Sequence, residues 1–342
     1  MRKILLSDVQ NKVENAGFKA KKDVRNIFFK KNMSIIDINV YSLRDISGYW
    51  GLLKNIIILI GGLRVGDIIF VNYPVYGKFT LNILFMLKKI KKIKVIGIIH
   101  DLDSLRSDSF DDSIVCFFDM VISHNQEMSK FLKKIGVIES KIYNLNLFDY
   151  ILDKDWDCFC DLKADDLDNY RVVFAGNLNK EKSGFIYKIQ YPVDIWGVNY
   201  DKNVNLNLNY CGFFDSENPK NFYEAYTNSR VFGLIWDGGS INSCEGRFGD
   251  YLLYNNPHKT SFYLSQNIPV IVWNSAAIAN FILSENCGIV VDTLSDLDEK
   301  LSLITLDQYR IMKENASRIG EKVRSGFYLS RAVDCSLEKL LE

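Results

Sequence analysis

Short aliphatic runs alternate with longer stretches of helical periodicity along almost the whole chain, which is the pattern of a parallel α/β protein. The runs fall into two series, and this predicts two Rossmann-like halves. We expect the ligand site in the cleft between the halves, outside the carboxyl ends of the strands. The predicted strands cover residues 3–6, 34–40, 67–71, 94–99, 120–123, 171–174, 193–196, 232–236, 269–273 and 288–291.

Helical patterns lie between these strands and at the end of the chain. Residues 151–169 are acidic and lack periodicity, so we place the connection between domains there. The expected parts are an N-terminal domain over residues 1–155, a C-terminal domain over residues 156–325 and a final helix over residues 326–342. The expected helices cover residues 81–90, 126–135, 221–228, 276–284 and 306–342.

Composition excludes several classes of protein. The 42 basic and 42 acidic residues leave no net charge, so nucleic acid is not an expected partner. The seven cysteines are scattered without a Cys-x-x-Cys pair, which argues against a zinc cage and fits the reduced thiols of a cytoplasmic protein. The most apolar run, residues 56–63, ends at Arg64 and is far shorter than the ~20 residues that a membrane span needs.

Residues 255–273 place a lysine where helix electrostatics disfavours it. Asn256 before Pro257 indicates a capped helix start, so Lys259 and Thr260 fall in the first turn. Free N–H groups and the helix dipole favour an anion at that end. A bound diphosphate would make the lysine favourable, whereas the plainer alternative is a capped helix whose lysine points to solvent.

Polar loops follow other predicted strands of the second half. Asn177 and Lys182 suit the same diphosphate as Lys259, and the Gly197–Val198 turn suits a flat nucleobase. Asp237 lies in a glycine-rich loop after another strand. Each loop alone is more simply a turn, but together they occupy the carboxyl ends of successive strands.

In the first half, a predicted strand ends directly in His100 and Asp101. Asp101 and Asp103 match the Asp-x-Asp pattern of metal-dependent glycosyltransferases. The same tripeptide recurs at residues 166–168 and 296–298, so chance supplies it readily and we do not favour a metal site.

Gly17 is predicted in the first strand-to-helix loop, where glycine lets a ligand approach the backbone. The chain has no Gly-x-Gly-x-x-Gly fingerprint, no P-loop and no Gly-x-Ser-x-Gly elbow, which argues against a nicotinamide dehydrogenase. A basic cluster remains, and it is either a solvated helix end or a contact for anionic lipid headgroups. It consists of Lys88, Lys89, Lys91, Lys92 and Lys94.

Taken together, these stretches resemble bacterial β-1,6-galactofuranosyltransferases of O-antigen and surface-polysaccharide assembly. More distantly, the chain is similar to streptococcal glucosyltransferases that extend GlcNAc on serine-rich adhesins. The resemblance covers residues 7–330 and is most specific over residues 234–273. Its motifs include HDLDSLR, FAGNLNKEKSGFIY, GLIWDGGSINSCEGRFGDYLLYNNPHKTSFYLS and IPVIVW.

The resemblance implies a GT-B fold whose C-terminal helices pack back toward the N-terminal domain, with the acceptor on the first domain and a UDP-sugar on the second. It implies that Lys259 contacts the donor diphosphate and that no metal or other cofactor is essential. The chain departs from the galactofuranosyl members at Glu245, where they have a small residue, so Glu245 receives no catalytic role. The implied donor-binding residues are Asn177, Lys182, Gly197, Val198, Tyr254, Asn256, Lys259 and Thr260, beside Gly17 and Asp237 above.

We therefore expect a hexosyltransferase that moves galactofuranose from UDP-galactofuranose onto a glycan acceptor, free or lipid-linked, in O-antigen or capsule assembly. Asp101 is the first candidate base, His100 the second and Asp8 the third. We expect a homo-oligomer in the cytoplasm or on the cytoplasmic face of the inner membrane. Three alternatives stay open: a transferase for UDP-glucose or another UDP-hexose acting on a glycoprotein or polysaccharide, a non-catalytic nucleotide-sugar-binding partner of another transferase, and a metal-dependent enzyme that uses Asp101 and Asp103.

Overall fold

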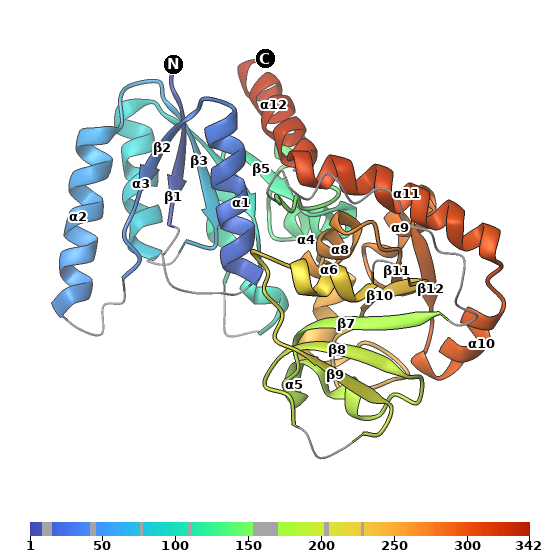
Figure 1. The fold of residues 1–342 in the computed structure, drawn as a ribbon. Coiled ribbons are helices and arrows are strands. Elements are labelled where there is room, and N and C mark those ends of the chain that lie inside the picture. The colour runs from blue at the N-terminus through green and yellow to red at the C-terminus, as the bar shows by residue number, and fades with distance from the viewer. Residues whose placement is uncertain are drawn as a thin grey trace. The chain divides into compact units, whose positions relative to one another are not determined.

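The fold consists of two compact units (Figure 1). One comprises Met1–Leu145 with Tyr328–Glu342, and the other comprises Asn146–Phe327. Within the described residues each unit holds a parallel sheet of six strands, which confirms the predicted α/β fold with two Rossmann-like halves. The structure is a computed structural model that describes residues 1–8, 16–41, 46–75, 78–107, 111–152, 170–201, 205–226 and 229–342.

The first sheet has the order β2-β1-β3-β4-β5-β6. The chain adds β2 on one side of β1 and β3 on the other, so the order of strands reverses at β1. The carboxyl ends of β1 and β3 therefore form the switch point where open α/β sheets bind ligands. Every residue of β3 is buried, as expected when helices cover both faces of a parallel sheet. The strands are β1 (Lys3–Ser7), β2 (Ser34–Asp37), β3 (Ile68–Tyr73), β4 (Lys94–Ile99), β5 (Met120–Ser123) and β6 (Ile142–Asn144), and the helices are α1 (Ala16–Lys30), α2 (Ile46–Gly62), α3 (Lys78–Lys91), α4 (Gln126–Lys134) and α12 (Phe327–Leu341).

The second sheet has the order β12-β11-β10-β7-β8-β9, and the order in which the chain adds strands reverses at β7. The strands are β7 (Arg171–Asn177), β8 (Val193–Val198), β9 (Leu208–Gly212), β10 (Val231–Ile235), β11 (Val270–Trp273) and β12 (Gly288–Val291). The helices are α5 (Lys180–Ser183), α6 (Lys220–Tyr226), α7 (Gly246–Gly249), α8 (His258–Ser265), α9 (Ala279–Glu285), α10 (Leu297–Ser302) and α11 (Leu306–Ser325).

The stretch 306–342 was predicted to be wholly helical, and this is wrong at Gly326 and at the last residue, Glu342. Gly326 has φ 81°, a left-handed conformation that ends α11 and starts α12 in a new direction. The final helix then packs on the first unit, as predicted. Lys31 Nζ lies 2.9 Å from Asp334 Oδ2, and Lys339 Nζ lies 6.0 Å from the centroid of the Tyr143 ring.

Helix α8 is fixed tightly within the second unit. The buried Tyr263 hydroxyl accepts from the Ala175 N–H at 2.7 Å and donates to the Val173 carbonyl at 3.2 Å, which joins α8 to β7. Glycines make room for the helix on both sides. A Cβ at Gly233 would lie 2.2 Å from the Tyr263 ring, and a Cβ at Gly320 of α11 would lie 2.3 Å from the Leu264 carbonyl oxygen.

We expect Tyr263→Phe to lower the free energy of unfolding by about 1–3 kcal/mol, because the buried Ala175 N–H loses its acceptor. Urea unfolding followed by circular dichroism measures this. Tyr210→Phe is the matched control, since its hydroxyl bonds to the Gly197 carbonyl at an exposed position. Equal stabilities for the two variants would contradict the role of Tyr263.

Candidate functional site

The predicted anion site lies at the carboxyl end of the second sheet. The Lys259 ammonium, in the first turn of α8, donates to Asp237 Oδ1 at 2.8 Å and to the Trp236 carbonyl at 3.2 Å. It also lies 4.4 Å from the centroid of the Phe174 ring. Its side chain is only 16% exposed. The alternative of a lysine that points to solvent is therefore wrong.

Positive charge exceeds negative charge at this position. Burial lowers the pKa of the Lys259 amine, Asp237 opposes this effect, and the nearby Lys182 ammonium lowers the pKa further. Two ammonium groups thus face one carboxylate at the positive end of a helix dipole. Such a site can accept an anion with more than one negative charge.

Two buried hydroxyls lie in the same turn of α8. Thr260 Oγ1 and Ser261 Oγ are inaccessible to solvent, and neither has a hydrogen-bond partner among the described residues. Leaving such groups without partners costs free energy, and an oxygen-rich ligand at the helix start would supply acceptors. In the first turn the Thr260 N–H donates to the Pro257 carbonyl at 2.9 Å, and the geometry of an α-helix provides no acceptor four residues earlier for the N–H groups that precede it.

The loop after β7 holds Lys182 in place. Asn177 Oδ1 accepts from the Asn179 N–H and from Asn199 Nδ2, both at 3.0 Å. The Ser183 hydroxyl donates to the Asn177 carbonyl at 2.7 Å. The Lys182 carbonyl accepts from the Gly238 N–H at 2.7 Å, which ties this loop to the loop of Asp237. The structure therefore brings Asn177, Lys182 and Asp237 into one framework.

Gly197 and Val198 were predicted to form a turn, but they are the last two residues of β8 and pair with β7 beside that framework. Gly197 has φ 146°, and a Cβ there would lie 1.7 Å from the Gly176 carbonyl oxygen, so only glycine fits. Two tyrosines that sequence reasoning missed lie next to it. The Tyr210 hydroxyl donates to the Gly197 carbonyl at 3.1 Å, and its ring stacks on that of Tyr200 at 5.0 Å. The GVNY sequence was the available signal, since it puts Tyr200 just after the end of β8.

Asn256 differs from its predicted role. We expected its side chain to cap α8, but Pro257 occupies the N-cap position and no side chain caps the helix. The Asn256 amide instead donates to the Asn146 carbonyl at 2.8 Å, because the side chain is buried. Tyr254, half-buried in the preceding turn, donates its N–H to the Tyr251 carbonyl.

The three candidate bases all follow strands of the first sheet. Asp101 accepts from Arg106 at 2.6 Å and its side chain is 34% exposed. His100 is buried, with Nε2 3.0 Å from Asn72 Oδ1. Asp8 is buried and accepts from Lys21 Nζ at 2.6 Å. Of these three side chains, Asp101 is the most accessible to an incoming substrate.

Two expectations for the first unit need comment. Gly17 was predicted in a loop, but it is exposed in the first turn of α1, because the helix already begins at Ala16. Asp101 and Asp103 do not belong to any cluster of three or more His, Cys, Asp or Glu side chains that could hold a metal ion in the described part of the chain. The recurrence of the tripeptide at residues 166–168 lies outside the described residues.

Comparison with known proteins places the chain. The N-terminal domain of the glucosyltransferase 3-like family matches residues 3–147, and the C-terminal domain matches residues 172–335. The chain belongs to the glucosyltransferase 3-like family. It is 34% identical to the β-1,6-galactofuranosyltransferase WbbI of Escherichia coli over 98% of each chain. It is 24% identical to glucosyltransferase 3 of Streptococcus gordonii over 82% of this chain and 83% of that one.

Solved structures agree on the fold of this glucosyltransferase 3-like chain. The lipopolysaccharide outer core galactosyltransferase WaaB has a TM-score of 0.62 and 10% identity, with 98% of this chain and 99% of that one covered. Anabaena HepE in complex with UDP and glucose has a TM-score of 0.58 and 12% identity, with 98% and 100% covered. The chain is a glycosyltransferase with the GT-B fold, as predicted.

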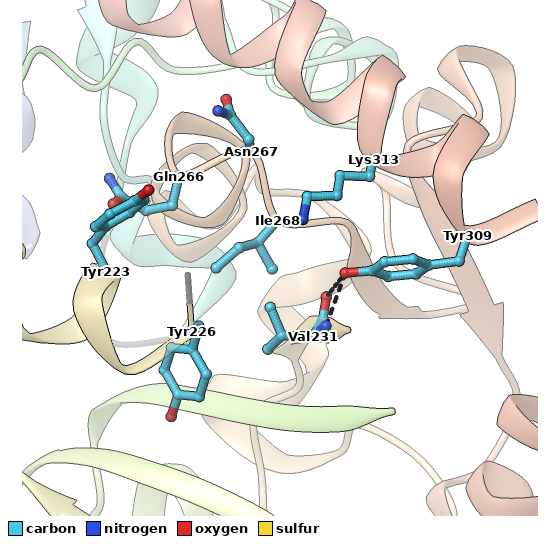
Figure 2. A pocket seen from close by; sticks show the side chains of 8 residues that line it. All are labelled: Tyr223, Tyr226, Val231, Gln266, Asn267, Ile268, Tyr309 and Lys313. Carbon is cyan, nitrogen blue, oxygen red and sulfur yellow. Dashed lines mark hydrogen bonds between the residues drawn. The ribbon is translucent and has the colours of Figure 1, made fainter. Parts of the chain in front are cut away.

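A small pocket elsewhere in this glucosyltransferase 3-like chain is a different kind of site (Figure 2). Its residues lie on α6 and α11 and at the amino ends of β10 and β11, whereas Lys259 lies near the carboxyl ends of these strands. Its volume is about 10 Å³, which is room for a single water molecule. Burial lowers the pKa of the Lys313 amine there to about 8. The lining residues are Tyr223, Tyr226, Val231, Gln266, Asn267, Ile268, Tyr309 and Lys313.

We expect Lys313→Met to raise the melting temperature of this family member at pH 7. The pKa of Lys313 is lower in the folded state than its ordinary value of 10.5, so below about 8 the folded chain buries a charge that the unfolded chain leaves in water. The gain should therefore be full below pH 8 and shrink as the pH rises toward 10.5. Differential scanning fluorimetry at several pH values measures it, with the exposed Lys300→Met as control. A gain that does not vary with pH would contradict the burial of charge.

Proposed function

We propose that this glycosyltransferase transfers a hexose from a UDP-sugar to a glycan acceptor in bacterial surface-polysaccharide assembly, with UDP-galactofuranose as the first donor. The observation that carries the donor class is the buried ammonium of Lys259 at the start of α8, joined by Lys182 and by two buried hydroxyls without partners. The resemblance to WbbI, whose name specifies a β-1,6-galactofuranosyltransferase, supports the sugar. The complex of HepE with UDP and glucose supports the nucleotide.

In this proposal the donor diphosphate lies across the first turn of α8. Lys259 and Lys182 donate to its oxygens, and the hydroxyl of Thr260 adds a neutral donor. Negative charge grows on the leaving diphosphate as the glycosidic bond breaks, so fixed positive groups stabilise the transition state more than the ground state. The uracil lies against Gly197 and Val198 at the end of β8, beside Tyr210.

The acceptor hydroxyl must lose a proton when it attacks the anomeric carbon with inversion. Asp101 is the proposed base, because its partly exposed carboxylate follows β4 and can approach a substrate. Arg106 holds the carboxylate in position through a hydrogen bond of 2.6 Å. Asp8 is less suited, because it is buried and already accepts a hydrogen bond from Lys21.

Turnover of individual UDP-sugars tests the proposal. Release of UDP should be fastest with UDP-galactofuranose and should increase when the acceptor glycan is added. Faster release with UDP-glucose or another UDP-hexose would replace the sugar and leave the reaction class intact. Tight UDP binding without turnover of any donor would instead favour a nucleotide-sugar-binding partner. Loss of activity in EDTA would favour the metal-dependent alternative.

In the same assay we expect Lys259→Ala to lower kcat/KM for the donor by about 10-fold to 100-fold, because a charged hydrogen bond to the diphosphate is lost. Lys182→Ala should weaken the donor in the same direction and leaves the Asp237 pairing undisturbed. Lys180→Ala is the matched control, since this lysine lies on the same short helix but pairs with Asp201. An unchanged kcat/KM in both Lys259→Ala and Lys182→Ala would exclude the proposed diphosphate site.

We expect Asp101→Asn to lower kcat by about 10²-fold to 10⁴-fold with little change in KM, because the amide cannot accept the acceptor's proton. Asp111→Asn is the control, an exposed carboxylate that bonds to Ser113. Steady-state kinetics with saturating donor and acceptor measures the effect. If Asp8→Asn abolishes turnover while Asp101→Asn does not, the base is Asp8.

A further inference from the structure

An apolar surface of unusual extent lies on helix α2 of the first unit. Five large side chains of this helix are between 43% and 63% exposed. At 100° per residue they fall within an arc of about 100°, so they form one stripe along the helix. Monomeric soluble proteins rarely leave such a stripe uncovered. The residues are Tyr49, Trp50, Leu53, Ile57 and Ile60.

The neighbouring helix α3 has a similar stripe. Phe79, Met86 and Ile90 are each more than half exposed and fall within an arc of about 40°. The two helices pack against each other (Figure 1). Lys91 of α3 joins them at one end, because its ammonium donates to the carbonyls of Ile60 and Leu63 in the last turn of α2 and just beyond it. We call these eight side chains of α2 and α3 the apolar face.

Buried residues fix the opposite side of α2, and the apolar stripe therefore faces outward. Asn55 is fully buried and forms four hydrogen bonds: its Oδ1 accepts from the Asn39 N–H and amide, and its Nδ2 donates to the Asn39 carbonyl and to Thr80 Oγ1. Leu59 is also fully buried. The helix cannot rotate its apolar stripe inward without breaking this network.

Basic residues dominate the segment that contains α2 and α3, although Lys88 pairs with Asp119 outside it at 3.0 Å. Residues 46–94 contain one acidic residue, Asp67, which is buried and paired with Arg2. The side chains of Lys54, Arg64 and Lys89 in this segment are exposed. Although the whole chain has no net charge, residues 46–94 therefore carry a clear excess of positive charge. The eight basic residues of the segment are Lys54, Arg64, Lys78, Lys88, Lys89, Lys91, Lys92 and Lys94.

We propose that the apolar face, with the lysines around it, docks this chain onto a membrane that contains anionic lipids. Trp and Tyr favour the headgroup region, aliphatic side chains enter the acyl boundary, and lysines pair with anionic headgroups. A second copy of the chain fits less well, because two surfaces with this excess of positive charge repel each other. No helix in the described part of the chain is both long and apolar enough to cross a bilayer, so α2 and α3 lie along the surface.

Co-sedimentation of the full chain with vesicles tests the proposal without using its activity. We expect binding to vesicles of phosphatidylcholine mixed equally with phosphatidylglycerol, weak binding to phosphatidylcholine alone, and loss of the difference at high salt. Because these vesicles carry no sugar and no donor is added, the result does not depend on the proposed function. Absence of binding to the mixed vesicles at low salt would overturn the proposal.

Two double variants test separately whether the apolar side chains and the lysines contribute to vesicle binding. The double variant Trp50→Ser with Ile57→Ser should weaken binding to both vesicle types. Lys89→Glu with Lys92→Glu should weaken only the binding to mixed vesicles, by about tenfold or more. The matched controls carry the same changes at exposed positions elsewhere and should bind like the wild type. They are Leu303→Ser with Ile311→Ser, and Lys134→Glu with Lys300→Glu.

Light scattering without lipid distinguishes a second copy as the occupant. If Trp50→Ser with Ile57→Ser reduces the mass of the particle and leaves vesicle binding unchanged, the apolar face is an interface between copies and the membrane proposal is wrong. If the mass is unchanged and vesicle binding falls, the membrane proposal holds. Melting temperatures equal to that of the wild type show that the exposed substitutions leave the fold intact.

Discussion

The buried ammonium of Lys259 is the constraint on which the second unit is organised. Moving such a group out of water costs several kcal/mol unless polar partners compensate. Asp237 and the Trp236 carbonyl, in the loop after β10, and the Phe174 ring, on β7, supply that compensation. Because the helix dipole opposes the charge as well, the arrangement becomes fully favourable only when an anion joins it. The contacts of Lys259 therefore leave positive charge at the start of α8 that an anion would stabilise further.

A charge held in this way needs a rigid frame. If α8 shifted by a fraction of a hydrogen-bond length, Lys259 would lose Asp237 while staying buried. Tyr263 prevents this by binding both the N–H and the carbonyl side of β7, and Gly233 and Gly320 let the sheet and α11 approach α8 without a gap. Close packing of this kind transmits small displacements instead of absorbing them. The same close packing occurs where Gly197 meets the Gly176 carbonyl, between β8 and β7.

The sequence predicted the parts of the fold that depend on local pattern. Strand β4, buried except at Lys94, and the fully buried strand β5 were located with their observed bounds, because continuous aliphatic runs are a strong signal. The edge strands β6 and β9 were missed, since they are short and partly exposed and so carry no apolar run. Helix α2 was missed because its apolar residues cover so much of its circumference that its periodicity is weak.

The candidate site shows the same division. Lys182 and Asp237 were selected from their places after predicted strands and Lys259 from the helix-start signal before it, and these need only local sequence and the order of elements. The pairing of Lys259 with Asp237 was beyond prediction, because 22 residues separate them and the contact depends on how α8 packs on β10. The same holds for Asn256, which suits an N-cap by its local sequence but is drawn to the Asn146 carbonyl 110 residues away. Tertiary contacts override local preference where a polar side chain is buried, because an unsatisfied buried amide costs more than a helix cap contributes.

Net charge illustrates the limit of whole-chain averages. The balance of 42 basic and 42 acidic residues argues against a polyanionic partner, and for a uniform surface that inference is sound. Here the balance arises from segregation, since residues 46–94 hold eight basic residues against one acidic residue and the rest of the chain carries the compensating excess of acid. Screening limits the reach of exposed charges to about 10 Å, so a surface partner responds to the local excess and not to the total. A neutral chain can therefore present a strongly cationic, apolar surface on α2 and α3 while its second unit concentrates positive charge at a separate, buried position around Lys259.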